Sequence, residues 1–291
     1  MTSNDSRADR LQWSVLTAKR PGLNRDLPPG KENLMWVANS STLIHGARDA
    51  VLVDTFLTID QTRTLADWIA ASGKDLIAIY VTHGHGDHFL GLATLLDRFP
   101  TARAVAIPEV VEAMREQLTP AWIDGFWRRL YPGEIAERLG VAEPLEDGGL
   151  ELEGHRLVVV NTGRTDTAPS TCLHVPSIGL IVGGDAVYNG VHPYLSETST
   201  ESRLEWIAAL DRLAALKPKA VVAGHKIPEN ADDPRILGET QQYLGDFNRL
   251  DAATTDAREF YDAMLALYPD RVNPGSLWGA VNAAKRPAIV A

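Results

Sequence analysis

The residues with the clearest capacity for chemistry lie within one short stretch of the sequence. Residues 83–88 read His-Gly-His-Gly-Asp-His and directly follow an apolar run. Imidazole nitrogens and carboxylate oxygens are the usual ligands of zinc and similar divalent ions. The two glycines permit tight bends that could turn alternate side chains toward one point, whereas a plain solvated turn with a capping aspartate needs only one short polar residue. The spacing therefore predicts a metal site that includes His83, His85, Asp87 and His88.

Two other apolar segments end in residues that could complete this site. Residues 181–185 read Ile-Val-Gly-Gly-Asp, and residues 221–225 read Val-Val-Ala-Gly-His. Each signal is weak alone, because an aspartate after a strand is commonly a turn former and a single histidine is commonly solvated. Together with the histidine-rich stretch, they indicate that Asp185 and His225 are metal ligands.

The elements that must position these residues are short strands in two blocks, each block followed by helices. Apolar runs bounded by turn-forming residues predict the strands, and apolar residues at helical spacing predict the helices. The expected strands span 35–38, 42–45, 50–54, 76–81, 102–107, 150–152, 156–161, 171–175, 179–183 and 220–223; the expected helices span 59–72, 89–99, 204–216 and two stretches of 235–268. This order predicts an α/β domain with two sheets face to face and helices outside.

The domain boundaries follow from local composition. We expect one domain over residues 1–291, with an irregular arm over 1–30 that is rich in proline, glycine and charge. Residues 108–141 are expected to form a helical insertion whose aromatic cluster packs as a lid or satellite core. Residues 235–291 are expected to form C-terminal helices.

Composition narrows the class of protein and its partners. Apolar residues make up 45% and charged residues 23% of the 291 residues, which is typical of a globular protein. The net charge of −10, from 28 basic and 38 acidic residues, argues against nucleic acid and anionic membranes as partners. The single cysteine, Cys172, forbids an internal disulfide, and the polar start has no apolar stretch typical of a signal peptide. We therefore expect a cytoplasmic protein that acts on a small molecule.

The order of these motifs resembles that of the metallo-β-lactamase-fold hydrolases. Asp54 at a strand end, His-x-His-x-Asp-His, Gly-Asp and Gly-His follow one another at the expected spacing over about residues 33–228. The resemblance implies a four-layer αββα sandwich with a metal site along one edge of its sheets. It implies that Asp54 orients ligand histidines and that the chain holds one or two Zn²⁺ ions, with Fe or Mn as alternatives. The implied ligands are His83 and His85 for the first metal, Asp87, His88 and His225 for the second, and Asp185 as the bridge.

One position departs from the family pattern. The family normally has a third histidine for the first metal, and here residues 160–167 read Val-Asn-Thr-Gly-Arg-Thr-Asp-Thr, with Arg164 in its place. A guanidinium is always charged and has no lone pair to donate, so it cannot be a ligand. Three consequences remain open: a weakened first metal, two metals with a substituted ligand, or Arg164 as a clamp for an anionic substrate. His192 and Asp166 are distant candidates for the substituted ligand.

The chemistry that best fits these residues is metal-assisted hydrolysis of a small-molecule ester, lactone or related substrate. Asp87 would orient the attacking water, and Tyr188 or Tyr194 would donate a hydrogen bond to an oxyanion, as a tyrosine does in lactonases of this fold. Lys226 could contact an anionic substrate. No basic C-terminal patch for glutathione is evident in residues 260–291, which argues against a thiolester hydrolase of the glyoxalase II type.

Two alternatives come from other functional classes. A metal-depleted pseudoenzyme or binding module would explain the lost histidine. A mononuclear-iron dioxygenase of the same fold would need the histidine that Arg164 replaces, so the sequence argues against it. Trp13, Trp36 and Trp278 could form a homodimer contact, although scattered tryptophans more often fill cores.

Overall fold

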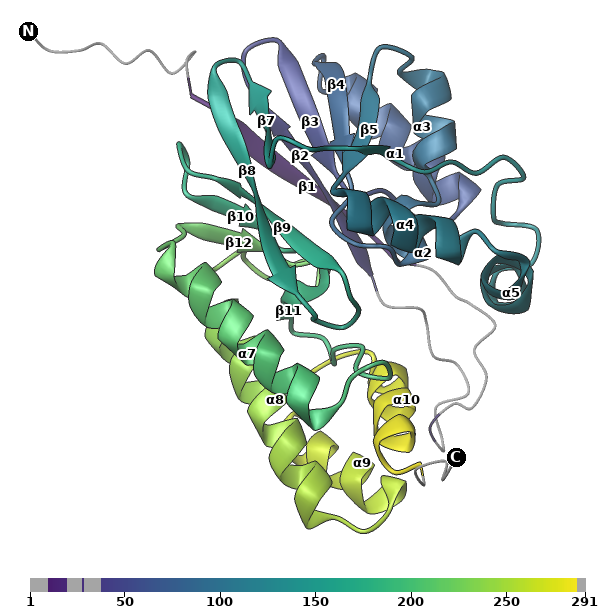
Figure 1. The fold of residues 1–291 in the computed structure, drawn as a ribbon, viewed down its shortest axis with the longest axis vertical. Helices are drawn as coiled ribbons and strands as arrows, with labels where there is room; N and C mark the ends of the chain where they lie inside the picture. The colour runs from purple at the N-terminus through teal and green to yellow at the C-terminus, as the bar shows by residue number, and fades with distance from the viewer. Residues whose placement is uncertain (1–9, 20–27, 29–37, 287–291) are drawn as a thin grey trace, which may run out of the picture.

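Two β-sheets pack face to face and carry helices on their outer faces (Figure 1). A computed structural model describes residues 10–19, 28 and 38–286. Helices α1 (Ile59–Ala71), α3 (Leu92–Arg98) and α4 (Pro108–Gln117) cover one sheet, and α7 (Thr200–Ala215) and α8 (Ile236–Ala253) cover the other. This arrangement is the predicted four-layer αββα sandwich.

The first sheet has eight strands within the described residues, in the order β11-β13-β2-β3-β4-β5-β6, with β1 also paired to β2. Its strands are β1 Gln12–Ala18, β2 Asn39–His45, β3 Asp49–Val53, β4 Asp75–Tyr80, β5 Arg103–Ala106, β6 Glu143–Pro144, β11 Tyr188–Asn189 and β13 His225–Lys226. Strand β4 is buried on both faces. Ala78 and Tyr80 join the core between the sheets, whereas Ile79 and Val81 join the core beneath α1 and α3. The apolar run of β4 is thus explained by two buried faces.

The second sheet has the order β12-β10-β9-β8-β7. Its strands are β7 Gly149–Leu152, β8 His155–Gly163, β9 Ser170–Val175, β10 Leu180–Val182 and β12 Ala220–Val222. Alternate residues again divide between two cores: Val222 packs between the sheets, and Val221 packs beneath the C-terminal helices. Strands β10 and β12 are parallel, so their carboxyl ends lie at the same edge.

Strand β1 corrects the predicted irregular arm over residues 1–30. It pairs antiparallel with β2 along its whole length. Trp13 and Val15 pack against the core between the sheets, and Leu16 and Ala18 pack against the core beneath α1. The sequence prediction missed this alternation because the flanking residues are rich in charge, proline and glycine. The expected strand at 35–38 lies outside the described residues except for Ala38.

The predicted helical insertion over 108–141 is helical only to Leu130. After α4 it contains α5 (Pro120–Trp122), a π-helical turn η2 (Ile123–Trp127) and α6 (Arg128–Leu130), and no helix is assigned between 131 and 141. Trp127 is buried, and its indole N–H donates to Oε1 of Gln117 at 2.9 Å. Trp127 and Leu130 therefore belong to the core beneath α1 and α3, with Phe126 packed against it, and not to the separate lid or satellite core that was expected.

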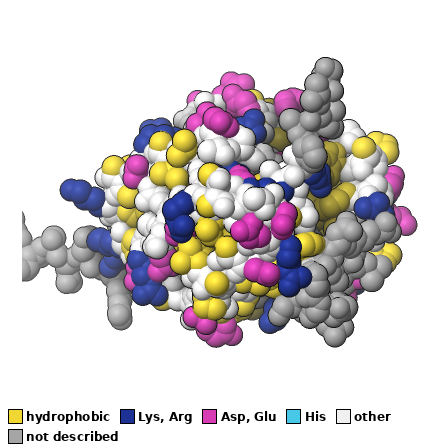
Figure 2. All heavy atoms as spheres, turned by 90° about the horizontal axis from the view of Figure 1, so that it is seen from below, with side chains coloured by type: hydrophobic (Ala, Val, Ile, Leu, Met, Phe, Trp, Pro, Cys, Tyr) yellow, Lys and Arg dark blue, Asp and Glu magenta, His cyan; other side chains and the backbone are white. Residues whose placement is uncertain are grey.

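The C-terminal segment forms α8, α9 (Ala257–Leu267) and α10 (Pro274–Ala284), which pack with α7 around a separate core. Seen from that end of the molecule, acidic and basic side chains are interspersed with small apolar areas (Figure 2). None of the helices in the described ranges combines the length and apolar character that a bilayer crossing requires. Of the tryptophans considered for a dimer contact, Trp13 and Trp278 pack partly against the cores, and Trp36 lies outside the described residues.

Candidate metal centre

Strand ends from both sheets converge at one edge of the sandwich. His83, His85, Asp87 and His88 follow β4, Asp185 follows β10, and His225 follows β12. The two sheets are joined here directly, because His83 forms a bridge with Ser170 and the backbone N–H of Thr171 donates to the carbonyl of Thr82 at 3.0 Å. Residues far apart in the sequence therefore lie in one cluster.

Three groups of ligand-type side chains, each with its atoms within 4.8 Å of one another, make up this cluster. They share members and so form one continuous site at the edge. The groups are His83 with His85, Asp166 and Asp185; Asp54 with His83 and His88; and Asp87 with His88 and His225.

On one side of the site, Asp166 contacts two histidines. Its Oδ2 lies 3.0 Å from Nδ1 of His85 and 3.8 Å from Nε2 of His83. Asp166 is fully buried, and its Oδ1 accepts a hydrogen bond from Thr165 Oγ1 at 2.8 Å. This side therefore presents two imidazoles and a carboxylate.

On the other side, Asp185 lies between two histidines. Its Oδ1 is 3.3 Å from Nε2 of His88, and its Oδ2 is 3.2 Å from Nε2 of His225. Oδ2 of Asp87 lies 3.5 Å from the same His225 nitrogen and accepts a hydrogen bond from Asn39 Nδ2 at 2.9 Å. Asp185 also belongs to the group around Asp166, so it links the two sides.

The ring nitrogens that face away from the site each have a partner. Nδ1 of His83 is 3.0 Å from Thr82 Oγ1, and Nδ1 of His88 is 3.0 Å from Asp54 Oδ2. Such outer contacts fix the tautomer and orientation of a ligand imidazole and leave the other nitrogen free to bind.

The other two histidines follow the same rule. Nδ1 of His225 lies 3.1 Å from the carbonyl oxygen of Ala38. Nε2 of His85 lies 3.4 Å from Oε1 of Glu197, a charge contact without a hydrogen bond. Glu197 is in turn held by hydroxyl donors from Tyr194 and Thr167, both at 3.2 Å. All four histidines therefore present one nitrogen to the cluster.

The backbone conformation at the end of β3 positions Asp54. It follows β3 in the left-handed region at φ 59°, which aspartate adopts more readily than most residues. Its carboxylate accepts from the backbone N–H and from the hydroxyl of Thr82, both at 2.8 Å, besides contacting His88. Asp54 thus contacts His88 directly and His83 through the Thr82 hydroxyl, and the orienting role that the resemblance implied stays a prediction.

Buried inward-facing atoms without hydrogen-bond partners show that the cluster fits a cation. Nε2 of His83, Nε2 of His88, Oδ2 of Asp166 and Oδ1 of Asp185 are all buried and lack such partners among the described residues. Orphaned buried polar atoms are costly unless something pairs with them. A divalent ion bound by these nitrogens and carboxylate oxygens would meet that need, and the donor set is one that zinc, iron or manganese accepts.

The electrostatics of the cluster point the same way. Burial would lower the pKa of His88, but the carboxylates of Asp185 and Asp87 outweigh it and raise that pKa well above its usual value. Burial would raise the pKa of Asp185, yet His225 and His88 lower it well below its usual range. Burial and the nearby His88 lower the pKa of His83 to about 4, which keeps it neutral as a ligand must be. The buried carboxylates therefore favour a positive charge at this edge of the sheets.

The loop between β8 and β9 turns Arg164 and Asp166 in different directions. Arg164 is exposed at the surface, whereas Asp166, two residues later, is buried against His85. Gly163, at φ 77°, and the bulge before it turn the backbone so that the arginine faces outward. The loop therefore places the carboxylate of Asp166, and not the side chain at position 164, next to His83 and His85.

The structure gives the other candidates specific partners. The Tyr188 hydroxyl donates to Asp185 Oδ2 at 2.8 Å, and the Tyr194 ring lies edge-on to His85 at 5.6 Å. Lys226 is buried and forms an ion pair with Asp232, so its ammonium group is not placed to contact a substrate. His192 is hydrogen-bonded to the Tyr243 hydroxyl at 2.9 Å and belongs to the C-terminal packing. The roles predicted for Tyr188, Tyr194 and Arg164 toward a substrate stay predictions.

Comparison with known proteins identifies the family. The model of the metallo-beta-lactamase superfamily matches residues 34–225. The chain belongs to this superfamily. A hydroxyacylglutathione hydrolase from a Synechococcus strain is 28% identical over 197 residues. The matched region covers 67% of this chain and 66% of the Synechococcus protein, so this chain spans slightly less than two thirds of that relative.

Solved structures support the metallo-beta-lactamase fold. A family protein from Thermus thermophilus matches with a TM-score of 0.61 at 23% identity, covering 93% of this chain and 91% of that one. A metallo-beta-lactamase from Pontibacter korlensis matches with a TM-score of 0.59 at 19% identity, covering 81% of this chain and all of that one. At these identities the likeness establishes the fold alone.

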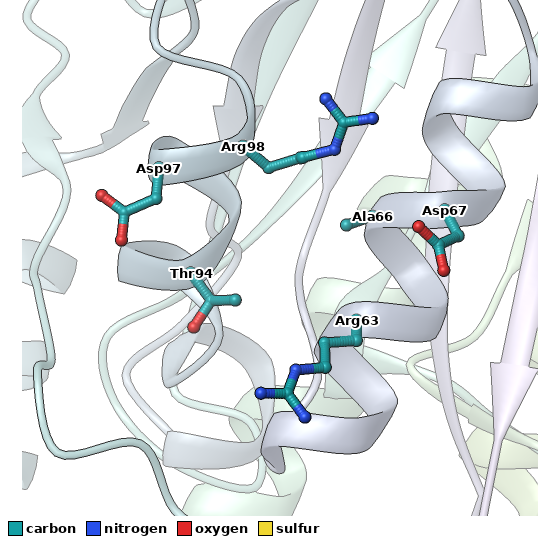
Figure 3. Close-up of a pocket in the computed structure, with 6 residues that line it drawn as sticks. All are labelled: Arg63, Ala66, Asp67, Thr94, Asp97 and Arg98. Atoms are coloured by element: carbon teal, nitrogen blue, oxygen red, sulfur yellow. The ribbon is translucent and has the colours of Figure 1, made fainter.

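A surface pocket lies apart from the ligand cluster, between helices α1 and α3 (Figure 3). Its lining carries charges of both signs and no histidine. The lining residues are Arg63, Ala66, Asp67, Thr94, Asp97 and Arg98. This pocket has none of the features of a catalytic site.

Proposed function

We propose that this protein is a metal-dependent hydrolase of a small-molecule ester or lactone. One observation carries the proposal: four histidines direct one ring nitrogen each toward three buried carboxylates. The other nitrogen of each ring contacts a neighbouring group outside the cluster. Divalent ions bound there would lower the pKa of a coordinated water to about 7 and polarise a carbonyl group.

The protein's own residues would position the reactants. Asn39 holds the carboxylate of Asp87, so that its oxygens can accept a hydrogen bond from the attacking water. Asp87 could then carry a proton toward the leaving group. The Tyr188 hydroxyl donates to Asp185. Tyr194 lies beside His85 and donates to Glu197, and its hydroxyl would donate to an oxyanion only after leaving that carboxylate.

The choice between an ester and a glutathione thiolester rests on the cationic residues near the C-terminus. The Arg271 side chain stacks between two tyrosine rings, and Lys285 pairs with Asp251 at 2.9 Å. Within the described residues, neither of these cations is available to bind a peptide carboxylate. We therefore favour an ester or lactone, and we keep a reducing cytoplasm as the proposed location because Cys172 is a buried free thiol.

The experiment compares hydrolysis of four substrates by protein as purified, after chelation, and after reloading with Zn²⁺. The panel contains an aryl ester, a lactone, an S-acyl glutathione and an aryl phosphodiester. We expect turnover of the ester or lactone that is lost on chelation, returns with metal and is abolished in Asp185→Asn. Turnover that survives chelation would contradict the proposal, as would fully metal-loaded protein that hydrolyses no member of the panel.

A further inference from the structure

We propose that Asp166 is a ligand of the first metal and takes the place of the imidazole that the family pattern would supply at position 164. The inference rests on the metal-dependent function proposed above and specifies how its site is built. Both halves of the site would then offer two imidazoles and one carboxylate around the shared Asp185.

The backbone of the β8–β9 loop brings Asp166 inward. The backbone N–H of Gly163 donates to Asn161 Oδ1 at 2.8 Å, and Gly163 adopts a left-handed conformation at φ 77°. Beyond this turn, Arg164 is exposed, whereas Thr165 and Asp166 are fully buried. The N–H of Thr165 donates to the carbonyl of Thr167 at 2.9 Å and closes the loop. The loop is therefore shaped to present the aspartate to the interior and the arginine to solvent.

The two carboxylate oxygens of Asp166 have different environments. Oδ1 is fixed by the Thr165 hydroxyl, whereas Oδ2 is buried without a hydrogen bond and faces His85 and His83. A carboxylate buried in this way is costly unless a cation pairs with it. The outward nitrogen of His83 is hydrogen-bonded with Thr82, and that of His85 lies 3.4 Å from Glu197 without a hydrogen bond. The other nitrogen of each ring faces Oδ2 of Asp166. Nε2 of His83, Nδ1 of His85 and Oδ2 of Asp166 together could therefore bind one metal ion, and we call these three residues the first half-site.

The exchange of an imidazole for a carboxylate changes which metal ions the half-site prefers. Carboxylate oxygens suit harder ions such as Mn²⁺, and two histidines with one carboxylate are a set that Fe²⁺ also accepts. The three carboxylates of the whole site, Asp87, Asp166 and Asp185, also neutralise more of the charge of two divalent ions than a site with one further imidazole would.

The test measures metal stoichiometry rather than activity. Chelated full-length protein is equilibrated with Co²⁺, and bound metal is determined by elemental analysis and by visible absorption of the cobalt. We expect about two equivalents for the wild type, about one for Asp166→Ala and about two for Arg164→Ala, the matched control from the same loop. Asp166→His should regain the second equivalent with an altered cobalt spectrum, because a nitrogen replaces an oxygen.

Retention of both equivalents by Asp166→Ala would overturn the inference, as would loss of one equivalent by Arg164→Ala or fewer than two in the wild type. Thermal unfolding of the metal-free forms checks that Asp166→Ala is folded, and Asp166→Asn provides a variant of nearly the same shape. Loss of a metal in Asp166→Ala without hydrolysis by the wild type would refute the proposed function alone. Hydrolysis by the wild type with both metals retained in Asp166→Ala would refute the inference alone.

Discussion

The outward contacts of the ligand histidines differ in kind. His88 rests on a buried carboxylate and His225 on a backbone carbonyl, whereas His85 faces Glu197, whose side chain is partly exposed. The 3.4 Å separation between His85 and Glu197 is also the longest of the four contacts. Glu197 is therefore the positioning residue that can be altered with the least disturbance to the core.

The substitution Glu197→Gln tests this positioning role. Removing the negative charge weakens the hold on His85, and we expect the first metal to bind about 10-fold more weakly, the lower end of the usual effect of such partners. Competition with a coloured chelator measures the affinity. Glu201→Gln, an exposed change nearby in α7, serves as the control. Equal affinities in both variants would show that Glu197 does not act through His85.

The candidate ligands at strand ends could be read from the sequence, whereas Asp166 was only a distant candidate and Glu197 was missed. His83, Asp185 and His225 each lie three residues beyond the end of an apolar strand, and this is a local signal. Asp166 becomes a neighbour of His85 only because Gly163 takes a left-handed conformation that turns Arg164 outward. Glu197 lies on the segment before α7, and no pattern in its own neighbourhood points to a histidine distant in the chain. Both depend on tertiary structure.

At the scale of elements, the turn between β12 and β13 requires a glycine at position 224, where the backbone passes close to the cluster. A Cβ built on Gly224 would overlap Oδ1 of Asp185 and lie 3.0 Å from Cε1 of His88. The close approach of backbone to carboxylate thus depends on the absence of a side chain.

Gly224→Ala should therefore displace Asp185 and reduce metal binding, and overpacking should cost about 1–3 kcal/mol of unfolding free energy. The control is Gly245→Ala, in the exposed face of α8 with open space around its Cβ, which should stabilise the fold by about 0.5–1 kcal/mol. Urea unfolding and metal titration measure both effects. Wild-type metal affinity in Gly224→Ala would mean that the site adjusts without cost.

The two sheets are also tied together at the far end of β2 and β3. Glu153, in the turn between β7 and β8, accepts backbone hydrogen bonds from Ala47, Arg48 and Asp49 at 2.7–2.8 Å. These donors, with that of Asp49 the strongest, lower the pKa of Glu153 from 4.5 to about 2. A carboxyl with a lowered pKa in the fold contributes stability above its unfolded pKa and loses it as the pH falls through its folded value.

Glu153→Gln should therefore lower the unfolding free energy by a constant amount above about pH 4.5, and the difference should shrink toward pH 2. Because Glu153 is exposed, the effect will be small. Denaturant unfolding of both metal-free proteins across the acid range measures it. A difference that does not change with pH would show that the contact does not involve the charged carboxylate.

Several short strands could not be predicted from the sequence. β11 and β13 contain two residues each; they pair with each other, and His225 of β13 also pairs with Asn39 of β2. Such strands have no periodicity of their own and exist only through distant partners. By contrast, β4 and α1 were predicted to within a residue of their ends because both have strong apolar patterns.

For the whole molecule, the fold class was predictable because apolar strands occur in two blocks, each followed by helices. Strands buried on both faces require cover on both sides, and a sandwich with outer helices provides it. The position of the candidate metal centre follows from that architecture, since side chains from both sheets meet where the strand ends of the two layers coincide. The choice of substrate does not follow from it, because function depends on the site and not on the fold.

We expect this cluster to bind metal in the folded state only, because its residues come together only there. The cation should therefore stabilise the whole domain, by about 2.7 kcal/mol when its free concentration is 100 times the dissociation constant. Chelation should lower the melting temperature, and excess Zn²⁺ should restore it. A melting temperature that does not respond to either treatment would mean that the cluster holds no ion.

The most direct test of the central claim is anomalous X-ray scattering at the zinc absorption edge from crystals of the zinc-loaded protein. We predict two peaks about 3.5–4 Å apart, with Asp185 between them. One peak should lie within bonding distance of His83, His85 and Asp166, and the other within bonding distance of Asp87, His88 and His225. Fully loaded crystals with no anomalous density among these residues would contradict the account.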